Sequence, residues 1–297
     1  MYVDQVTAQP VTQSVLLTGS GSNPQGIIVP GLISDLLGND TTPTSGFSGD
    51  GGPATGAVFA IPAAIAMDVL GNIYIADSGN NVVRVVYANG NVPNVVNPLQ
   101  GHIYTIAGVP TAAGAGVDGV QATASPLSNP IGVAVDALGN IYISDSNNGA
   151  VRMVSATTGI ITTVAGTLNN PTPGFAGDGG PATAALLSVP SGISVDGNGN
   201  LFIADSNNNA VRVVYAGGAQ LAALIALEIP GTTAVPGNIY TIAGGPANTG
   251  LPLNGDGGLA SLGNLNSPAA VVLSLIHISV SRPTTRNATL GGAFRCL

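Results

Sequence analysis

The sequence contains no lysine and no tryptophan, and its single cysteine is Cys296. Fourteen acidic residues and three arginines precede Val272, which gives this part of the chain a formal net charge of −11. A surface of that charge repels phosphate backbones, so we expect no nucleic-acid partner. No apolar run reaches the roughly 18 residues that a membrane-spanning helix requires, so we also expect no membrane span.

Glycine and proline are abundant, with 43 and 21 residues, and they recur at regular places. A GDGG loop, a proline, an aspartate-ended strand and a Gly-Asn turn follow one another in two clear copies and in a looser one, and a fourth copy begins at Gly255 and breaks off. The shared prolines are Pro62, Pro130, Pro190 and Pro268. Three further positions recur: Asp68, Asp136 and Asp196; Asp77, Asp145 and Asp205; Arg84, Arg152 and Arg212. Such self-similarity predicts a repeat architecture.

Each copy predicts four short strands. In the third copy they cover residues 191–196, 201–204, 210–215 and 238–243, which are rich in β-branched and aromatic residues. Asn, Gly and Asp fill the turns between the strands. Four antiparallel strands per repeat are typical of a propeller blade, so the predicted fold is all-β, a partial, open β-propeller of four-stranded antiparallel blades.

The motifs themselves resemble a known family. NIYIADSGNNVVRVV, NIYISDSNNGAVRMV and NLFIADSNNNAVRVV, together with GFSGDGGPAT and GFAGDGGPAT, are similar to the blades of bacterial NHL-repeat proteins. The resemblance covers about residues 45–272. It implies NHL-type propeller blades and a binding role, as in most relatives.

The repeats also define the expected domain organisation. We expect residues 1–26 to be a linker or the end of a preceding domain, and residues 27–272 to be the partial propeller. Its blades lie at about 46–108, 118–166 and 174–244, a further blade starts at 255–272, and residues 27–35 match the last strand of a preceding blade. Residues 273–278 resemble a translated sequencing adapter, so we expect 273–297 to be a non-native tail.

The recurrent charged positions invite both structural and functional interpretations. The GDGG loops could bind an anion or calcium, but a tight inter-blade link whose aspartate bonds local amides is favoured. Asp205, Asn207 and Asn209 share the first spacings of an EF-hand loop yet lack its later glycine and glutamate, which favours turn chemistry. We therefore predict no metal site and no cofactor.

The three arginines offer the sharpest alternative. They could form a basic ring that binds a ligand, or each could pair with a carboxylate. A guanidinium group bridges carboxylates well, so we favour structural pairing, with Asp77, Asp145 and Asp205 as first candidates. Within the insertion of the third copy, residues 220–229 predict a short helix packed on its own blade.

Two functions remain open on the sequence. The first is a non-catalytic binding or scaffold module that presents propeller loops to protein or glycan partners, outside the cell or at its surface. The alternative is a fragment of a six-bladed enzyme, a metal-dependent lyase or lactonase, whose catalytic residues lie in other blades. Before Val272 the chain has one histidine, His102, and no Ser-His-Asp set, nucleotide loop or CxxC motif. We therefore predict no catalytic residue and favour the binding module.

Overall fold

A computed structural model describes residue 38 and residues 46–169, 174–245 and 259–273. The expected strand at residues 27–35, the GDGG loop at Gly255 and the tail beyond residue 273 lie outside these ranges. Within them, no helix is long or apolar enough to cross a membrane.

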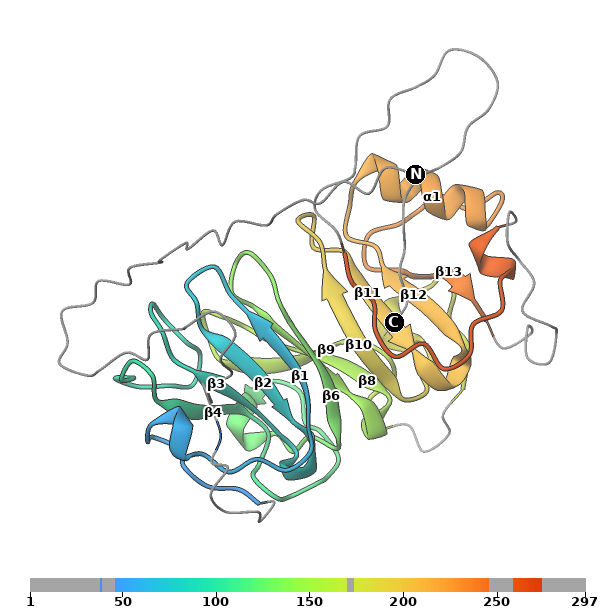
Figure 1. The fold of residues 1–297 in the computed structure, drawn as a ribbon. Coiled ribbons are helices and arrows are strands. Elements are labelled where there is room, and N and C mark those ends of the chain that lie inside the picture. The colour runs from blue at the N-terminus through green and yellow to red at the C-terminus, as the bar shows by residue number, and fades with distance from the viewer. Residues whose placement is uncertain (1–37, 39–45, 170–173, 246–258, 274–297) are drawn as a thin grey trace, which may run out of the picture. The chain divides into compact units, whose positions relative to one another are not determined.

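Three antiparallel sheets follow one another along the chain, and each corresponds to one predicted blade (Figure 1). The first consists of β1 (Pro62–Met67), β2 (Ile73–Asp77), β3 (Val82–Val86) and β4 (Ile103–Ala107). The second consists of β6 (Pro130–Val135), β7 (Ile141–Asp145), β8 (Ala150–Val154), β9 (Ile160–Ala165) and the short β5 (Val120–Gln121). The third consists of β10 (Pro190–Val195), β11 (Leu201–Asp205), β12 (Ala210–Val214) and β13 (Ile239–Gly244).

The sequence pattern explains these strands. Apolar β-branched residues fill β2, β3 and their counterparts, which are buried on both faces, and Gly-Asn turns with positive φ at glycine join the first two strands of each sheet. The predicted all-β partial propeller of four-stranded blades is thus confirmed. The second blade alone adds a fifth strand, because β5 pairs with β9 where the other blades make single bridges, Pro53–His102 and Pro181–Asn238.

Short 3-10 helices complete the repeats. They follow the loop that opens each copy, which ends in proline, glutamine or, in the fourth copy, Leu259, and they also follow each second strand. They are η1 (Ala54–Gly56), η2 (Ser78–Asn80), η3 (Ala122–Ala124), η4 (Ser146–Asn148), η5 (Ala182–Ala184), η6 (Ser206–Asn208) and η8 (Ala260–Leu262). The predicted helix is confirmed as α1 (Ala219–Glu228), which packs beside β13 through the buried Ile225.

Successive blades pack face to face. The first strands β1, β6 and β10 contact one another in sequence, and at each of these two junctions a hydrophobic cluster combines one blade's sheet with residues of the next. The fourth copy follows the same rule as far as it is described, because Val271 lies in the core of the third blade.

Candidate functional site

Each blade buries one arginine at the third position of its third strand. Arg84, Arg152 and Arg212 have no exposed surface, and the register of the neighbouring fourth strand shifts beside each of them. A bulge of this kind changes where a side chain points. The three guanidinium groups lie inside separate blades and do not line one solvent-exposed site.

A buried aspartate from the same blade faces each guanidinium group. This residue ends the second strand and, like the arginine, has no exposed side-chain surface. The closest nitrogen–oxygen distances are 3.6, 3.3 and 3.4 Å in the pairs Arg84–Asp77, Arg152–Asp145 and Arg212–Asp205. These aspartates are the partners that the sequence analysis ranked first.

A second aspartate comes from the loop that opens each repeat. The distances are 2.8, 2.8 and 2.6 Å in the pairs Arg84–Asp50, Arg152–Asp118 and Arg212–Asp178. The expectation that this aspartate bonds local amides needs correction, because it reaches an arginine 34 residues later in every blade. That constant spacing is present in the sequence and is the signal that could have identified the pair.

The buried aspartates also bind the backbone just before the first strand of each blade, which is β1, β6 or β10. The second carboxylate oxygen of Asp77 accepts the backbone N–H of Ala60 at 2.8 Å, two residues before the shared proline. Asp145 and Asp205 do the same at 2.7 and 2.8 Å. The residue directly before the proline has a positive φ in all four copies: Ile61 (50°), Asn129 (53°), Val189 (52°) and Ser267 (47°). Such a conformation is strained, above all for a β-branched residue, and in the three blades the aspartate network holds it in place.

Burial raises the pKa of Asp77, Asp145 and Asp205 above the usual range of an aspartate. The neighbouring asparagine amide, a backbone N–H and the arginine each act in the opposite direction. A perturbed carboxyl group can mark a catalytic site. Here each one is enclosed by its partners, which points to a structural role.

The third set of recurrent aspartates caps the turn after the first strand. Asp68 accepts the backbone N–H groups of Leu70 and Asn72, both at 2.9 Å, and Asp136 and Asp196 repeat the pattern. This is local turn chemistry. Among the described residues no group of three or more His, Cys, Asp or Glu side chains is arranged to hold a metal ion.

His102 takes part in the same repeated structure. Its Nδ1 lies 2.8 Å from the carbonyl oxygen of Gly51, and in the third blade Asn238 donates to the corresponding Gly179 carbonyl at 2.7 Å. Asparagine replaces histidine at this place without loss of the contact. In the second blade Ile160 takes this place opposite Gln121, so the repeat requires neither this side-chain contact nor a histidine here.

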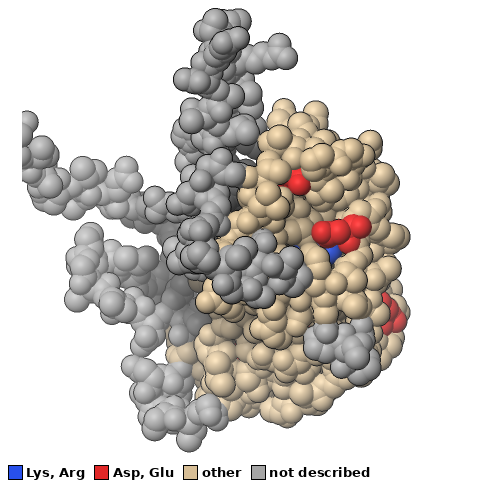
Figure 2. Space-filling view, turned by 90° about the vertical axis from the view of Figure 1, so that its right-hand side faces the viewer, with Lys and Arg blue, Asp and Glu red and all other residues tan. Residues whose placement is uncertain are grey.

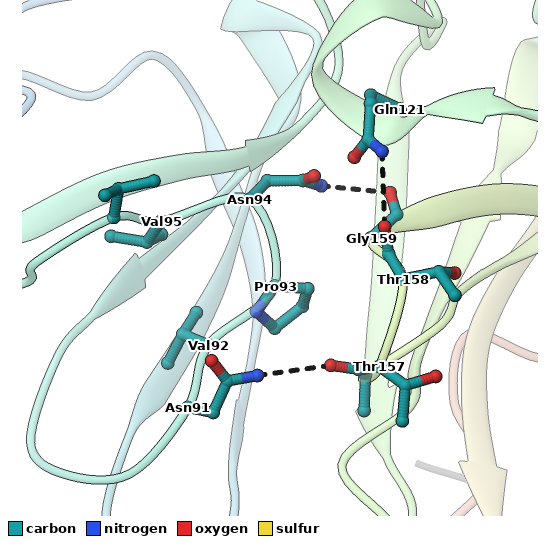
Figure 3. A pocket seen from close by; sticks show the side chains of 11 residues that line it. Asn91, Val92, Pro93, Asn94, Val95, Gln121, Thr157, Thr158 and Gly159 are labelled. Carbon is teal, nitrogen blue, oxygen red and sulfur yellow. Dashed lines mark hydrogen bonds between the residues drawn. The ribbon is translucent and has the colours of Figure 1, made fainter.

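A pocket of about 260 Å³ lies between the first two blades (Figure 3). Its walls are the segment that follows β3, from Asn91 to Val96, and the β8–β9 turn around Thr157 to Gly159, with Gln121 beside them. Asn94 donates across the gap to the carbonyl of Gly159 at 3.1 Å, and Gln121 donates within the second blade to the carbonyl of Thr158 at 3.2 Å. No charged side chain lines it.

The blade surface is sparsely charged. Figure 2 shows one face, where acidic side chains form small separate groups among uncharged residues. The loop aspartates Asp50, Asp118 and Asp178 retain 34%, 44% and 31% of their side-chain exposure while they bind the arginines. The buried arginines thus partly neutralise the charge of these exposed aspartates.

Comparison with known proteins agrees with the repeat pattern. The family model described as NHL repeat matches residues 127–152 and 187–214, in the second and third blades. The chain therefore carries NHL repeats, and the resemblance inferred from the sequence is confirmed.

Two curated relatives and one solved structure illustrate the similarity. "Protein SUPPRESSOR OF QUENCHING 1, chloroplastic" of Arabidopsis thaliana is 35% identical over 115 residues, 38% of this chain and 10% of that protein. "NHL repeat-containing protein 2" of Homo sapiens is 31% identical over 166 residues, 53% of this chain and 21% of that protein. A structural genomics protein of unknown function from Bacteroides thetaiotaomicron is 19% identical with a TM-score of 0.44, over 71% of this chain and 41% of that one. The chain thus spans a small part of the curated relatives.

Proposed function

We propose that the chain is a non-catalytic binding module that presents its loops to a protein or glycan partner, outside the cell or at its surface. The observation that carries the proposal is the pocket between the first two blades, which is lined by side-chain amides, hydroxyls and aliphatic groups and by no charged residue. The buried arginines and aspartates, by contrast, pair with one another within their blades.

The chemistry of the pocket favours a neutral ligand rich in hydrogen-bonding groups. Asn91, Gln121 and Thr157 are exposed at its rim, and amide and hydroxyl groups both donate and accept. Val92 and Pro93 supply a buried apolar floor. Sugar hydroxyls or the peptide groups of an extended segment match this combination, whereas a phosphate or carboxylate would find no cation there.

The role of His102 supports the non-catalytic proposal. Its ring bonds the Gly51 carbonyl in the place that Asn238 takes in the third blade, so its position follows from the repeat. The proposed location outside the cell is consistent with blades that contain no cysteine, since Cys296 is the single one in the chain. Antibody detection of the native protein on intact cells or in the medium tests that location.

An array of neutral and acidic glycans, probed with the full chain, tests the binding function. We expect neutral glycans to be retained and Asn91→Asp to weaken the binding by about tenfold or more, since one lost hydrogen bond to a partner is worth roughly that factor. Asn198→Asp, in an exposed turn of the third blade, is the matched control and should bind as the parent does. Retention of acidic glycans alone, or equal binding by both variants, would contradict the proposal.

A further inference from the structure

The described part of the chain contains three asparagine–glycine pairs, and their glycine nitrogens have different surroundings. The pairs are Asn89–Gly90, Asn148–Gly149 and Asn198–Gly199. In such a pair the backbone nitrogen of glycine can attack the side-chain amide of asparagine, because glycine has no Cβ atom to hinder the approach. The reaction requires a nitrogen that lies close to the amide carbon and is not held elsewhere.

Two of the three pairs have their glycine nitrogen held in a turn. Gly149 donates its backbone N–H to the carbonyl of Ser146 at 3.2 Å, and Gly199 donates to the carbonyl of Asp196 at 3.0 Å. The side chain of Asn148 is in addition buried. In these two pairs the turn directs the nitrogen away from the asparagine side chain.

The pair in the segment after β3 has the reactive arrangement. Both residues are exposed, and the backbone N–H of Gly90 donates to Oδ1 of Asn89 at 2.8 Å. Since a carbonyl bond is about 1.23 Å long, the nitrogen lies within about 4 Å of the side-chain amide carbon. The glycine nitrogen is therefore directed at the group that it would attack.

A buried side chain activates the same peptide group. Nδ2 of Asn72, a residue with no exposed surface, donates to the backbone carbonyl oxygen of Asn89 at 2.9 Å. When the Gly90 nitrogen loses its proton, the negative charge is shared with that oxygen, so a preorganised donor there stabilises the anion. In the third blade Asn200 donates in the same way to Gly217 at 2.9 Å, but glycine has no side-chain amide to be attacked.

The local fold also requires glycine directly after Asn89. Gly90 has a φ of 77°, and a Cβ atom at this position would collide with the side chain of Leu70. The unhindered nitrogen beside an exposed asparagine is therefore a consequence of how this segment turns.

We infer that Asn89 and Gly90 form a self-modification site at which the chain converts Asn89 to aspartate and isoaspartate. The Gly90 nitrogen gives its proton to hydroxide from the solvent and forms a bond to the side-chain carbon of Asn89. The bond from that carbon to Nδ2 breaks, and the leaving nitrogen takes a proton from water and departs as ammonia. Water then adds to either carbonyl of the resulting succinimide ring, which opens to aspartate or to isoaspartate.

Both products change the pocket between the first two blades. Asn91, the residue after Gly90, lines this pocket and donates to the carbonyl of Ala156 at 3.4 Å. The lining contains no charged side chain, whereas either product places a carboxylate two residues away from Asn91. Isoaspartate also lengthens the backbone at residue 89 by one methylene group. The reaction therefore makes the charge and shape of one pocket wall depend on the age of the chain.

Incubation of the full chain in mildly alkaline buffer, followed by peptide mapping with mass spectrometry, tests the site. The matched control lies in the same molecule, since Asn198 is also an exposed asparagine followed by glycine. We expect Asn89 to be converted faster than Asn198 by about tenfold or more, because its glycine nitrogen lies near the target and that of Asn198 is held in a turn. In concentrated urea the two rates should become similar, since both pairs are then part of an unfolded chain.

The products and one variant complete the test. A succinimide opens to isoaspartate as well as aspartate, whereas direct hydrolysis of the side-chain amide gives aspartate alone. Asn89→Gln should stop conversion at this position, because its ring closure would have to form a six-membered imide, and should leave the rate at Asn198 unchanged. Equal rates at Asn89 and Asn198 in the folded chain, a difference that persists in urea, or aspartate as the single product would overturn the inference.

Discussion

A buried arginine between two carboxylates gives each blade one ionic centre that joins three parts of the chain. Arg212 connects the opening loop through Asp178, the second strand through Asp205 and its own strand β12. Phe175 lies over the same guanidinium group, and the central carbon of that group is 4.7 Å from the centre of the phenyl ring. These contacts offset part of the cost of burying the charge.

Replacement of Arg212 by leucine should destabilise the chain by about 3–5 kcal/mol, because the fully buried Asp205 would lose its cation. Asp178→Asn is the matched control. Its carboxylate is 31% exposed and can be hydrated, so the loss should be smaller, about 1 kcal/mol. Urea unfolding curves measure both. Equal stability of Arg212→Leu and the parent chain would show that the pair contributes nothing.

A tyrosine beside the turn aspartate should make the chain sensitive to alkali. Burial first, and then the charge of Asp136, raises the pKa of Tyr142 to about 12. Its hydroxyl donates to Asp136 at 3.2 Å. Because a tyrosine in the unfolded chain ionises at about pH 10, the contribution of this residue is complete below that pH and is lost as the pH rises towards about 12.

We therefore expect Tyr142→Phe to lessen the fall in unfolding free energy between about pH 9 and about pH 11.5, a range that brackets the ionisation of an ordinary tyrosine. The third blade supplies the reverse test, since Phe202 stands where Tyr142 stands in the second. Phe202→Tyr should increase the alkaline loss. Denaturant midpoints measured across this pH range check both variants. If both followed the parent curve, ionisation of Tyr142 would not be a cause of the alkaline loss.

At the residue scale the sequence could indicate part of the ionic network. Asp77 ends β2 and Arg84 lies in the paired strand β3, so the geometry of this hairpin brings the two residues together. Asp50 reaches Arg84 only because the whole loop folds back across the blade, and strand patterning does not contain that information. Comparison of spacings between copies would have supplied it.

At the scale of elements, the junction between blades depends on residues with positive φ. Asn81 and Asn209 adopt this conformation, and their side chains accept the backbone N–H groups of Asn129 and Ser267 at 2.9 and 2.8 Å. Gly149 occupies the same place in the second blade with a φ of 64° and no side chain. The second junction therefore lacks a hydrogen bond that the first and third possess.

Gly149→Asn should stabilise the chain by about 0.5–1 kcal/mol, since it restricts the unfolded state and adds an acceptor for the Val189 N–H. A Cβ atom at Gly149 would lie 3.3 Å from the Leu187 carbonyl oxygen, a close approach that a small shift relieves. Asn209→Gly is the opposite change and should destabilise. Thermal unfolding checks both, and a lower melting temperature for Gly149→Asn would show that strain outweighs the gain.

Elements were easier to predict than their junctions. The strands of the third copy and α1 lie within one or two residues of their predicted bounds, because period-two apolar patterns and Gly-Asn turns determine them locally. The positive φ of Ile61 and Val189 has no such signal, since a residue before proline normally prefers an extended conformation. Tertiary contacts with the buried aspartates override that preference.

At the scale of the whole molecule, negative charge and an exposed apolar face oppose each other. The part of the chain before Val272 has a formal net charge of −11, which disfavours self-association. The face formed by Ile65, Met67 and Val69 favours it, because burial of large aliphatic side chains is favourable wherever a partner surface is available. The balance between the two should depend on ionic strength.

We expect the chain to self-associate in a concentration-dependent way and to do so more strongly in salt. Raising sodium chloride from about 0.05 to about 0.5 M shortens the Debye length several-fold, which screens the repulsion between acidic surfaces and leaves the apolar contact intact. Sedimentation velocity at both salt concentrations measures the effect. Ile65→Asp should reduce association at either concentration, because it places a charge in the middle of the face, whereas Leu138→Asp, in an exposed turn of the second blade, should not. A monodisperse monomer in high salt would show that this face does not associate in the isolated chain.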